Sequence, residues 1–480
     1  MNKLIVFILC IALFSCKKEI DFSSDQGGPL NFSNDTITFD TIFASIGSIT
    51  KTLTVYNYND YDVTTNIRLS GNSSANFRMN IDGIAGNNQE DINIPANDSI
   101  FIFLEVTIDP SNNTTPYILS DSIIFSSDNN SQTVKLVAWG QDAYFHTPNT
   151  FGEIINGTDT TKFYYHLLDC SVPWENDKPH VIYGYAIVDP GNTLTINEGC
   201  QVYLHKNSGL IIGNPFNEEK GGTLIINGQL GNEVTFQGDR LDSWYKDSPG
   251  QWDRIWITPG SIDNNINYAI IKNGNIGIHA DTVYNNNPTL NISNTVISNM
   301  TGVGILGQGA KINGHNLVIS KCGQYTVACN IGGQYSFSHC TFANYWDYGR
   351  RSTPSILLNN YYEGIDGQTY IRDLEEASFT NCIIDGGLST EVSFMKNDNG
   401  NFNYMFQNCL IKLDNSDVNS TNYSDIILNK NPEFVNVSNN DFNLTESSPA
   451  INSAILTSFT NDISGNFRSE PDIGAYEYID

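Results

Sequence analysis

The chain has 480 residues, and 24 Lys and Arg against 52 Asp and Glu give a formal charge of 24 − 52 = −28. This acidity argues against nucleic acid as a partner, because neutralising phosphates requires clustered basic residues. Only 16% of the residues are charged, while 40% are hydrophobic and 11% are aromatic. The composition therefore excludes a disordered acidic chain, and the length predicts two or more folded domains.

The N-terminus predicts export. Lys3 provides a positive charge, and residues 4–14 form an apolar run that is too short to span a bilayer. We therefore expect a signal peptide over residues 1–15.

The end of this run predicts a lipid anchor. Residues 13–16 read Leu-Phe-Ser-Cys, which resembles the bacterial lipobox, where small residues precede a cysteine that becomes diacylated. The resemblance implies that Cys16 carries lipid and holds the protein on a membrane. Residues 17–21 look like the charged tether of Bacteroidetes outer-membrane lipoproteins, some of which face outward. The expected location is the outer membrane, lipid-anchored, with cell-surface exposure left open; the alternative is an ordinary secretory signal with a chance cysteine.

A tether and a β-sandwich are expected next. Residues 16–34 are small and polar enough for a tether, and residues 35–142 alternate short apolar strands with Asn, Asp, Ser and Gly clusters. This pattern predicts a sandwich of about seven strands. The runs TLTVYNYND, SANFRMN and VKLVAWGQD resemble immunoglobulin-like domains of the ASPM/SPD-2/Hydin type, and that resemblance implies a spacer or binding module rather than an enzyme.

After a junction and N-terminal cap at residues 143–180, the sequence becomes repetitive. One short strand and turn recur, and the aligned positions are separated by 26, 22, 23, 42 and 27 residues. This spacing is typical of a parallel β-solenoid with one coil per step, in which the step of 42 holds either two coils or one coil and a long loop. The aligned positions are Ala269, Thr295, Leu317, Cys340, Cys382 and Cys409.

Two columns of side chains follow from this alignment. The three aligned cysteines are expected to stack in the core about 4.8 Å apart, because no C-x-x-C or histidine pair accompanies them as a metal site would require. The side chains at the position before them are expected to form hydrogen bonds with backbone groups of the turn. It is occupied by Asn294, Asn316, His339, Asn381 and Asn408.

Residues 181–445 resemble the right-handed parallel β-helix superfamily, the pectate-lyase-like fold. Residues 446–480, with the SPAI step and the DIGAYEY ending, resemble the choice-of-anchor Q type of C-terminal segment, which implies a cap over the last coil. Within it, Asp462, Arg468 and Asp472 could form a salt bridge, which we favour, or hold Ca²⁺; we expect no other cofactor. The predicted fold class is all-β, an N-terminal β-sandwich followed by a right-handed parallel β-helix.

Motifs of catalysis are missing from the sequence. It contains no H-E-x-x-H, G-x-S-x-G, Walker A or C-x-x-C motif, and the G-x-G-x-x-G at residues 302–307 is not followed by a helix pattern. The paired aspartates of polygalacturonases and the arginine pattern of pectate lyases are also lacking. Whether the protein is an enzyme stays open, with the sequence favouring a non-enzyme; an enzyme on this fold would be a carbohydrate-active lyase or hydrolase.

Two insertions interrupt the repeat and concentrate aromatic and charged residues. Aromatic faces stack on sugar rings, and charged groups fix hydroxyls or carboxylates, so these insertions are the predicted ligand-binding regions. The alternative is that they only pack along the outside of the solenoid. The candidates are Trp244, Tyr245 and Lys246 in the first insertion, and Tyr345, Trp346, Asp347, Tyr348, Arg350, Arg351, Tyr361, Tyr362 and Arg372 in the second.

The sequence thus supports three hypotheses. The leading one is non-enzymatic binding of a carbohydrate or another extracellular ligand along the β-helix. The others are a polysaccharide lyase or glycoside hydrolase, and a structural or adhesive rod. The ligand or substrate is not specified by the sequence.

Overall fold

The computed structural model divides the chain into two compact units, residues 1–142 and residues 143–480. Cys16 and the signal peptide lie outside the described residues, as does most of the tether. In the described part of the chain the regular structure is β-strand apart from one short 3₁₀ helix, and no helix there is long and apolar enough to cross a membrane. The described residues are 28–43, 47–71, 76–107, 117–127, 130–156, 159–215, 221–242, 244–281, 287–413 and 421–479.

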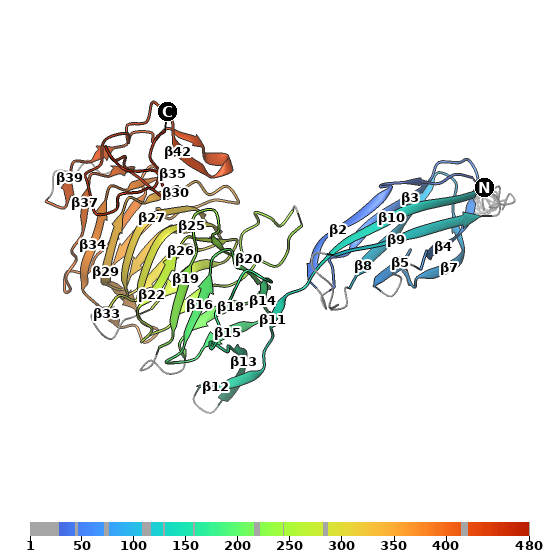
Figure 1. The fold of residues 1–480 in the computed structure, drawn as a ribbon, viewed down its shortest axis with the longest axis horizontal. Helices are drawn as coiled ribbons and strands as arrows, with labels where there is room; N and C mark the ends of the chain where they lie inside the picture. The colour runs from blue at the N-terminus through green and yellow to red at the C-terminus, as the bar shows by residue number, and fades with distance from the viewer. Residues whose placement is uncertain are drawn as a thin grey trace, which may run out of the picture. The chain divides into compact units, whose positions relative to one another are not determined.

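Two five-stranded sheets form the first unit (Figure 1). Alternate residues of the longer strands are buried, as in Lys51–Asn57 and Asp98–Val106, and the buried residues of both sheets form one core. One sheet has the order β1 (Asn31–Phe32), β3 (Lys51–Asn57), β8 (Asp98–Val106), β5 (Phe77–Ile81) and β6 (Ile84–Ala85). The other has the order β2 (Thr36–Phe43), β10 (Asn130–Gln141), β9 (Tyr117–Ser127), β4 (Val63–Leu69) and β7 (Asn88–Ile94).

An 18-stranded sheet dominates the second unit. Its strands pair in parallel with strands of the preceding and following repeats. The strands are β11 (Tyr144–His146), β14 (His180–Ile182), β16 (Thr193–Asn197), β17 (Gln201–Leu204), β19 (Thr223–Asn227), β20 (Val234–Gly238), β22 (Asn264–Asn267), β23 (Ala269–Lys272), β25 (Leu290–Met300), β27 (Lys311–Cys322), β29 (Gly333–Ser338), β30 (Thr341–Asn344), β34 (Leu374–Thr380), β35 (Ile383–Gly386), β37 (Met405–Gln407), β38 (Leu410–Ile411), β39 (Tyr423–Ser424) and β40 (Ile427–Leu428).

A ten-stranded sheet and two small hairpins complete this unit. The sheet contains β12 (Thr150–Asn156), β13 (Asp159–Leu167), β15 (Tyr185–Val188), β18 (Gly209–Ile212), β21 (Ile255–Ile257), β24 (Ile276–Ala280), β26 (Val303–Gln308), β28 (Val327–Asn330), β31 (Ile356–Asn359) and β36 (Val392–Met395). The hairpins are β32 (Tyr361–Glu363) with β33 (Thr369–Ile371), and β41 (Phe434–Asn436) with β42 (Asp441–Leu444), the latter joined through the 3₁₀ helix Val437–Asn439.

Parallel partners in the large sheet are offset by the same numbers of residues as the aligned repeats. The step of 42 contains one coil and long loops, because β30 pairs directly with β35. This pattern is compatible with the parallel β-helix that the sequence predicts. Offsets of 26, 22, 23, 42 and 27 separate the paired residues Ile270, Val296, Val318, Thr341, Ile383 and Leu410.

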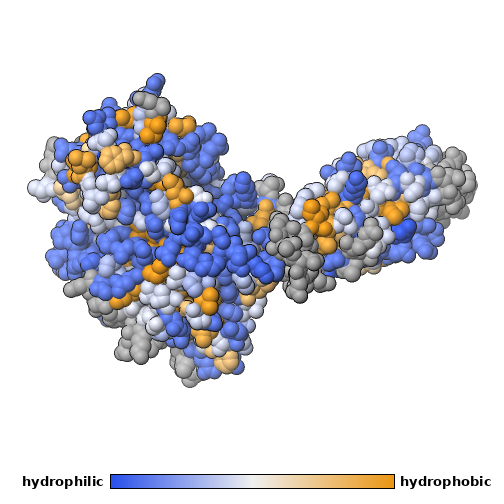
Figure 2. Space-filling model, in the orientation of Figure 1, coloured by the Kyte–Doolittle hydropathy of each residue, from blue (hydrophilic) through white to orange (hydrophobic). Residues whose placement is uncertain are grey.

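Apolar side chains of both sheets fill the interior of the second unit, and its visible surface in Figure 2 is mostly hydrophilic with small apolar patches. Cys340, Cys382 and Cys409 are completely buried within that core, and the Cys382 backbone N–H lies 3.4 Å from Cys409 Sγ. Burial raises the pKa of the Cys382 and Cys409 thiols well above the usual value. These cysteines therefore pack as apolar core residues.

The asparagine column has a conformation that the sequence alignment did not reveal. All five of its residues, including His339, have φ between 48° and 56°, in the left-handed region. Asparagine tolerates this region better than other non-glycine residues, which explains its recurrence at this turn. The side chains also bond along the column: Asn316 Nδ2 donates to Asn294 Oδ1 at 2.9 Å, and Asn381 Nδ2 lies 2.9 Å from His339 Nε2.

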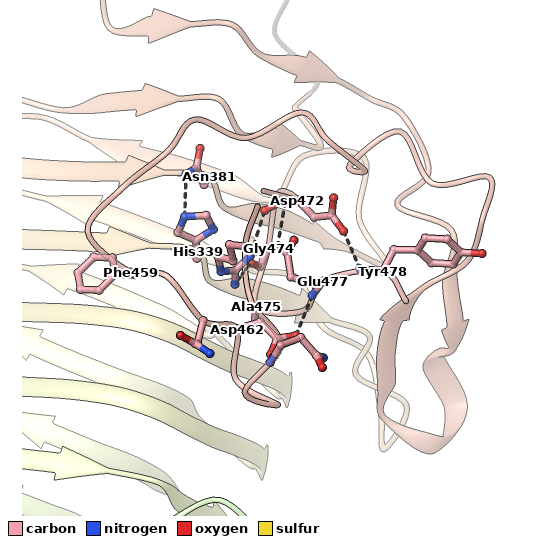
Figure 3. A network of polar contacts seen from close by, with 12 residues as sticks. His339, Asn381, Phe459, Asp462, Asp472, Gly474, Ala475, Glu477 and Tyr478 are labelled. Carbon is pink, nitrogen blue, oxygen red and sulfur yellow. Dashed lines mark hydrogen bonds and ion pairs between the residues drawn. The ribbon is translucent and has the colours of Figure 1, made fainter. Parts of the chain in front are cut away.

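The C-terminal segment, residues 446–479, was expected to cap the last coil; it packs on Ile427 of β40 but also extends past earlier repeats. It lies along the asparagine column, of which Figure 3 shows His339 and Asn381, and its hydrogen bonds pass successive turns in reverse order. The backbone carbonyls of Ser453, Ile455 and Asn461 accept hydrogen bonds from Asn408, Asn381 and Asn316, at 3.4, 2.8 and 2.9 Å. Apolar residues of the segment also pack on the outer face of the large sheet, where Ile473 and Ala450 contact Ile383 and Leu410. The segment is a strap across several repeats.

An ion pair and backbone amides fix the end of this strap (Figure 3). Arg468 pairs with Glu477, and its Nη2 donates to the Gly474 carbonyl at 3.1 Å. The Asp462 carboxylate accepts the backbone N–H of Asn466 at 2.7 Å, and the Asp472 carboxylate accepts that of Tyr478 at 2.6 Å. The described ion pairs of Arg468 thus contain Glu477 in place of the expected Asp462 or Asp472, whose carboxylates bond backbone amides instead. No group of three or more acidic, His or Cys side chains in the described part of the chain is arranged to hold a metal ion.

Candidate functional site

The first insertion connects β20 to β21 and projects one aromatic side chain. Trp244 is 81% exposed, whereas the Tyr245 ring is covered by Arg240, whose guanidinium carbon lies 3.4 Å from the ring centroid. Lys246 is exposed, and its backbone carbonyl accepts a hydrogen bond from Asn273 at 2.8 Å. Because backbone contacts hold this loop, its exposed side chains are available to a ligand.

The second insertion begins directly after β30. Tyr345 Oη donates to Asp385 Oδ2 at 2.5 Å, and the Asp347 carboxylate lies 3.1 Å from Lys321 Nζ. Trp346 packs against Tyr348, with 5.3 Å between the ring centroids. Arg350 is exposed.

A hydrogen bond brings the two insertions together. Tyr348 Oη donates to the backbone carbonyl of Asp247 at 2.5 Å, although the two residues are 101 positions apart. The loop that carries Trp244 is thereby fixed to the loop that carries Trp346. The two joined loops carry five of the candidate residues, which we call together the aromatic platform: Trp244, Lys246, Trp346, Tyr348 and Arg350.

Arg351 does not contribute to that platform because it is buried. Its guanidinium forms two hydrogen bonds with the Glu391 carboxylate, at 2.6 and 2.8 Å, and donates to the carbonyls of Asn344 and Thr353. Glu391 is fully buried and also accepts the backbone N–H of Ser355 at 2.8 Å. This pair therefore fixes the ends of the loop and leaves Arg351 without access to a ligand.

The remaining candidates lie on the hairpin β32–β33, at the opposite end of β31 from Tyr345 and Arg351. Figure 1 shows β33 well separated from β30 and β35. Tyr361 is half-buried and Arg372 is exposed, whereas Tyr362 stacks on Tyr370 with 4.9 Å between the ring centroids. The structure thus divides the second insertion into two regions, and only the first meets the insertion that carries Trp244.

A pocket of about 470 Å³ opens beside Tyr345. Asp385 Oδ1 lies 3.7 Å from Lys412 Nζ, and the same ammonium donates to the Gly386 carbonyl at 2.7 Å. Burial, together with the Asp385 charge, raises the pKa of Tyr345, so its hydroxyl stays protonated and donates to that carboxylate. We call this cavity the Lys412 pocket. Its lining residues are Tyr345, Asp385, Ser389, Lys412, Asn429, Lys430 and Asn431.

Comparisons with known proteins do not assign this chain to a family. No protein-family model matches it, and the search of curated proteins gives no match. Among solved structures, a family 123 glycoside hydrolase from Clostridium perfringens aligns with a TM-score of 0.18 and 13% identity, over 24% of this chain and 30% of the hydrolase. The present chain thus matches less than a third of that protein.

Two further solved structures are similarly distant. A protein of unknown function from Porphyromonas gingivalis W83 aligns with a TM-score of 0.18 and 14% identity, over 28% of this chain and 66% of that one. The catalytic domain of a GH87 α-1,3-glucanase, in complex with nigerose, aligns with a TM-score of 0.18 and 10% identity, over 81% of this chain and 92% of that domain. Similarity at this level supports no statement about the site.

Most residues of the Lys412 pocket were not predicted from the sequence, although the repeat alignment contained a signal for two of them. Asp385 and Lys412 each follow the recurring Asn-Cys strand by the same number of residues, so they occupy equivalent positions in adjacent repeats. A carboxylate next to an ammonium in one column indicates a paired polar site. Asn429 to Asn431 carried no such signal, because they follow the last strand of the sheet.

A larger pocket of about 570 Å³ lies in the first unit, beside Arg78, Phe103 and Glu105. Arg78 and Glu105 form an exposed ion pair there, with 3.5 Å between the charged groups. Both side chains are therefore already paired, and the sequence places no aromatic insertion beside them.

Proposed function

We propose that this protein is a lipid-anchored, non-enzymatic carbohydrate-binding protein of the outer membrane. In this proposal Cys16 carries the lipid, the first unit acts as an immunoglobulin-like spacer, and the second unit is a right-handed parallel β-helix. The observation that carries the binding function is the junction of the two insertions, where the hydroxyl of Tyr348, which packs on Trp346, bonds the loop that carries the exposed Trp244. Aromatic faces of this kind stack on the apolar faces of sugar rings.

The geometry supports carbohydrate binding better than catalysis by a glycoside hydrolase or a polysaccharide lyase. Glycoside hydrolysis uses two carboxyl groups across the scissile bond, and Asp385 is the single carboxylate among the residues that line the Lys412 pocket. A lyase needs a free base, whereas the raised pKa of Tyr345 keeps that hydroxyl protonated, Arg351 is buried against Glu391, and Lys412 donates to the Gly386 carbonyl as an ammonium beside Asp385. Beside Lys246 and Arg350 the platform carries two carboxylates, because burial and the charges of Asp347 and Asp247 raise the pKa of Tyr348, but Asp347 is already paired with Lys321 at 3.1 Å.

A glycan array with the full chain tests this proposal. We expect binding to a subset of glycans, and we expect Trp244→Ala, and Trp346→Ala combined with Arg350→Ala, to weaken it at least about tenfold, because stacking and charged contacts each contribute more than 1 kcal/mol. Ile365→Ala is the matched control, since Ile365 is fully exposed on the hairpin β32–β33 away from the platform. An array without binding, or binding unchanged in both platform variants, would refute the proposal.

Enzymatic activity is tested separately. Incubation with uronic-acid polymers and Ca²⁺ should yield neither unsaturated products nor new reducing ends. Products that disappear in Asp385→Asn would replace the binding proposal by the lyase or hydrolase alternative.

A further inference from the structure

The Lys412 pocket has a charge opposite to that of the chain. Its lining contains Lys412 and Lys430 against Asp385, which gives 2 − 1 = +1, whereas the whole chain has a charge of −28. Two lysines around one cavity are unusual in a sequence with more than twice as many acidic as basic residues. The pocket is therefore a local positive site on an acidic protein, and local charge decides which ligand a cavity accepts.

The Asp385 carboxylate is already engaged at the base of the pocket. It accepts the Tyr345 hydroxyl, lies 3.7 Å from Lys412 Nζ, and is almost completely buried. Its contacts hold Lys412 in place, and they leave it poorly accessible as an acceptor for the hydroxyl groups of a neutral sugar.

The ammonium groups retain donors for a ligand. An ammonium has three N–H groups, and Lys412 uses one for the Gly386 carbonyl and directs another toward Asp385. The Lys412 side chain is 35% exposed. Lys430 is exposed, and the described contacts give it no hydrogen bond or ion pair. Two cationic donors thus face one cavity of about 470 Å³, a volume within the range of small-ligand sites.

We infer that the Lys412 pocket binds an anionic group, a carboxylate or a sulfate ester, carried by a sugar. Lys412 and Lys430 bind the anion, while Tyr345 and Asp385 position Lys412. This inference rests on the proposed function in one respect, that the molecule bearing the anion is a carbohydrate. It adds a charge requirement that the aromatic platform does not impose, because stacking on a tryptophan does not depend on the charge of the sugar.

Matched glycan pairs test the charge requirement. Each uronic-acid oligosaccharide is compared with its methyl ester, and each sulfated oligosaccharide with its desulfated form, on the full chain. We expect the acidic member to bind about tenfold tighter, as for a hydrogen bond between charged groups, and we expect this preference to weaken as salt is added. The carboxylate and sulfate pairs distinguish which anion the pocket prefers.

Three variants assign the preference to the pocket. Lys412→Gln and Lys430→Gln should each reduce the preference for acidic glycans several-fold, whereas Lys206→Gln, which removes an exposed lysine in the loop between β17 and β18, should not change it. Asp385→Asn keeps a side-chain oxygen that can accept the Tyr345 hydroxyl and removes a negative charge next to the anion, so it should increase the affinity for acidic glycans. An increase cannot result from a loss of folded protein, so this variant keeps the test decisive.

The outcomes separate this inference from the proposed function. Equal binding of acidic and neutral members, with loss in the Trp244→Ala variant, overturns the anion site and retains carbohydrate binding. A preference for acidic glycans that survives both lysine variants also overturns the pocket assignment. Absence of binding to every glycan overturns both.

Discussion

Two segments lie on the outside of the parallel sheets, and each contains a buried arginine paired with a glutamate. In the loop at residues 345–355, Arg351 and Glu391 form a pair that also bonds the backbone at both ends of the loop. In the strap, Arg468 and Glu477 form a pair that has two further carboxylates nearby, Asp462 and Asp472, which counteract the lowering of the Arg468 pKa by burial. The loop thus depends on one charge pair, whereas the strap distributes its attachment over many contacts.

The largest effect is expected from breaking the pair that holds the loop. Glu391→Gln keeps the shape of the side chain but leaves the buried Arg351 guanidinium without a counter-charge, so the free energy of unfolding should fall by about 3–5 kcal/mol. Glu477→Gln should cost less, about 1–3 kcal/mol, because Asp462 and Asp472 still compensate Arg468. Denaturant unfolding of both variants measures the difference, and equal losses would contradict the distinction between loop and strap.

An intermediate effect is expected where the strap crosses the asparagine column. Asn381 donates to the Ile455 carbonyl at 2.8 Å, accepts the Ile455 N–H at 3.0 Å, and has φ of 56°. Asn381→Ala removes these two bonds and the contact with His339, and it places alanine in the left-handed region, so we expect a loss of about 2–3 kcal/mol. Asn381→Gly should recover about 1 kcal/mol of it, because glycine adopts this conformation without strain. Denaturant midpoints of the two variants separate the contributions, and identical midpoints would exclude backbone strain as a cause.

Local periodicity made much of this architecture predictable from the sequence. The offsets of the parallel strands equal the spacing of the repeats, because each repeat must return its apolar residues to the same interior column. The cysteine and asparagine columns followed from the same alignment. The path of the strap did not, since Asn316 and Asn461 are 145 positions apart and the bond between them reflects no local pattern.

Side-chain direction limited the prediction of the site. Arg350 and Arg351 are adjacent and chemically identical, yet one is exposed and the other is buried against Glu391, 40 residues away. Aromatic and basic residues in the second insertion looked like one group, whereas β31 separates them. Composition identifies a loop that can bind a ligand, but it does not determine which of its side chains face the same surface.

A smaller effect, confined to low pH, is expected at His339, the one histidine in the asparagine column. Burial, assisted by Arg468 and His315, lowers the pKa of His339 to about 3 from an ordinary value near 6.5. The unfolded chain therefore takes up the proton first, and this contribution to stability is present above pH 6.5 and is lost progressively as the pH falls toward 3.

His339→Asn places in the column the residue that its neighbours have, and it removes this titration. We expect unfolding free energies within about 0.5 kcal/mol of each other at pH 7 and a variant that is more stable than the parent below pH 6. Glu477 and Asp472 have raised pKa values that act in the opposite direction, but they are common to both proteins. Parallel curves of stability against pH would show that His339 does not contribute to acid sensitivity.

The smallest effect on stability is expected from the bond that joins the two insertions. Tyr348→Phe removes the hydroxyl that donates to the Asp247 carbonyl and keeps the ring that packs on Trp346, so the free energy of unfolding should fall by no more than about 1 kcal/mol. The effect should instead be local. Backbone amides of residues 244–250 should exchange with solvent faster, because the first insertion loses its attachment to the second.

Tyr370→Phe is the matched control for that measurement. Tyr370 is a similarly exposed tyrosine whose hydroxyl donates to Asp366 at 2.6 Å, but within the hairpin β32–β33. Its removal should leave exchange at residues 244–250 unchanged. If Tyr348→Phe also leaves it unchanged, the two insertions are not held together by this bond, and the aromatic platform would have to be replaced by two independent loops.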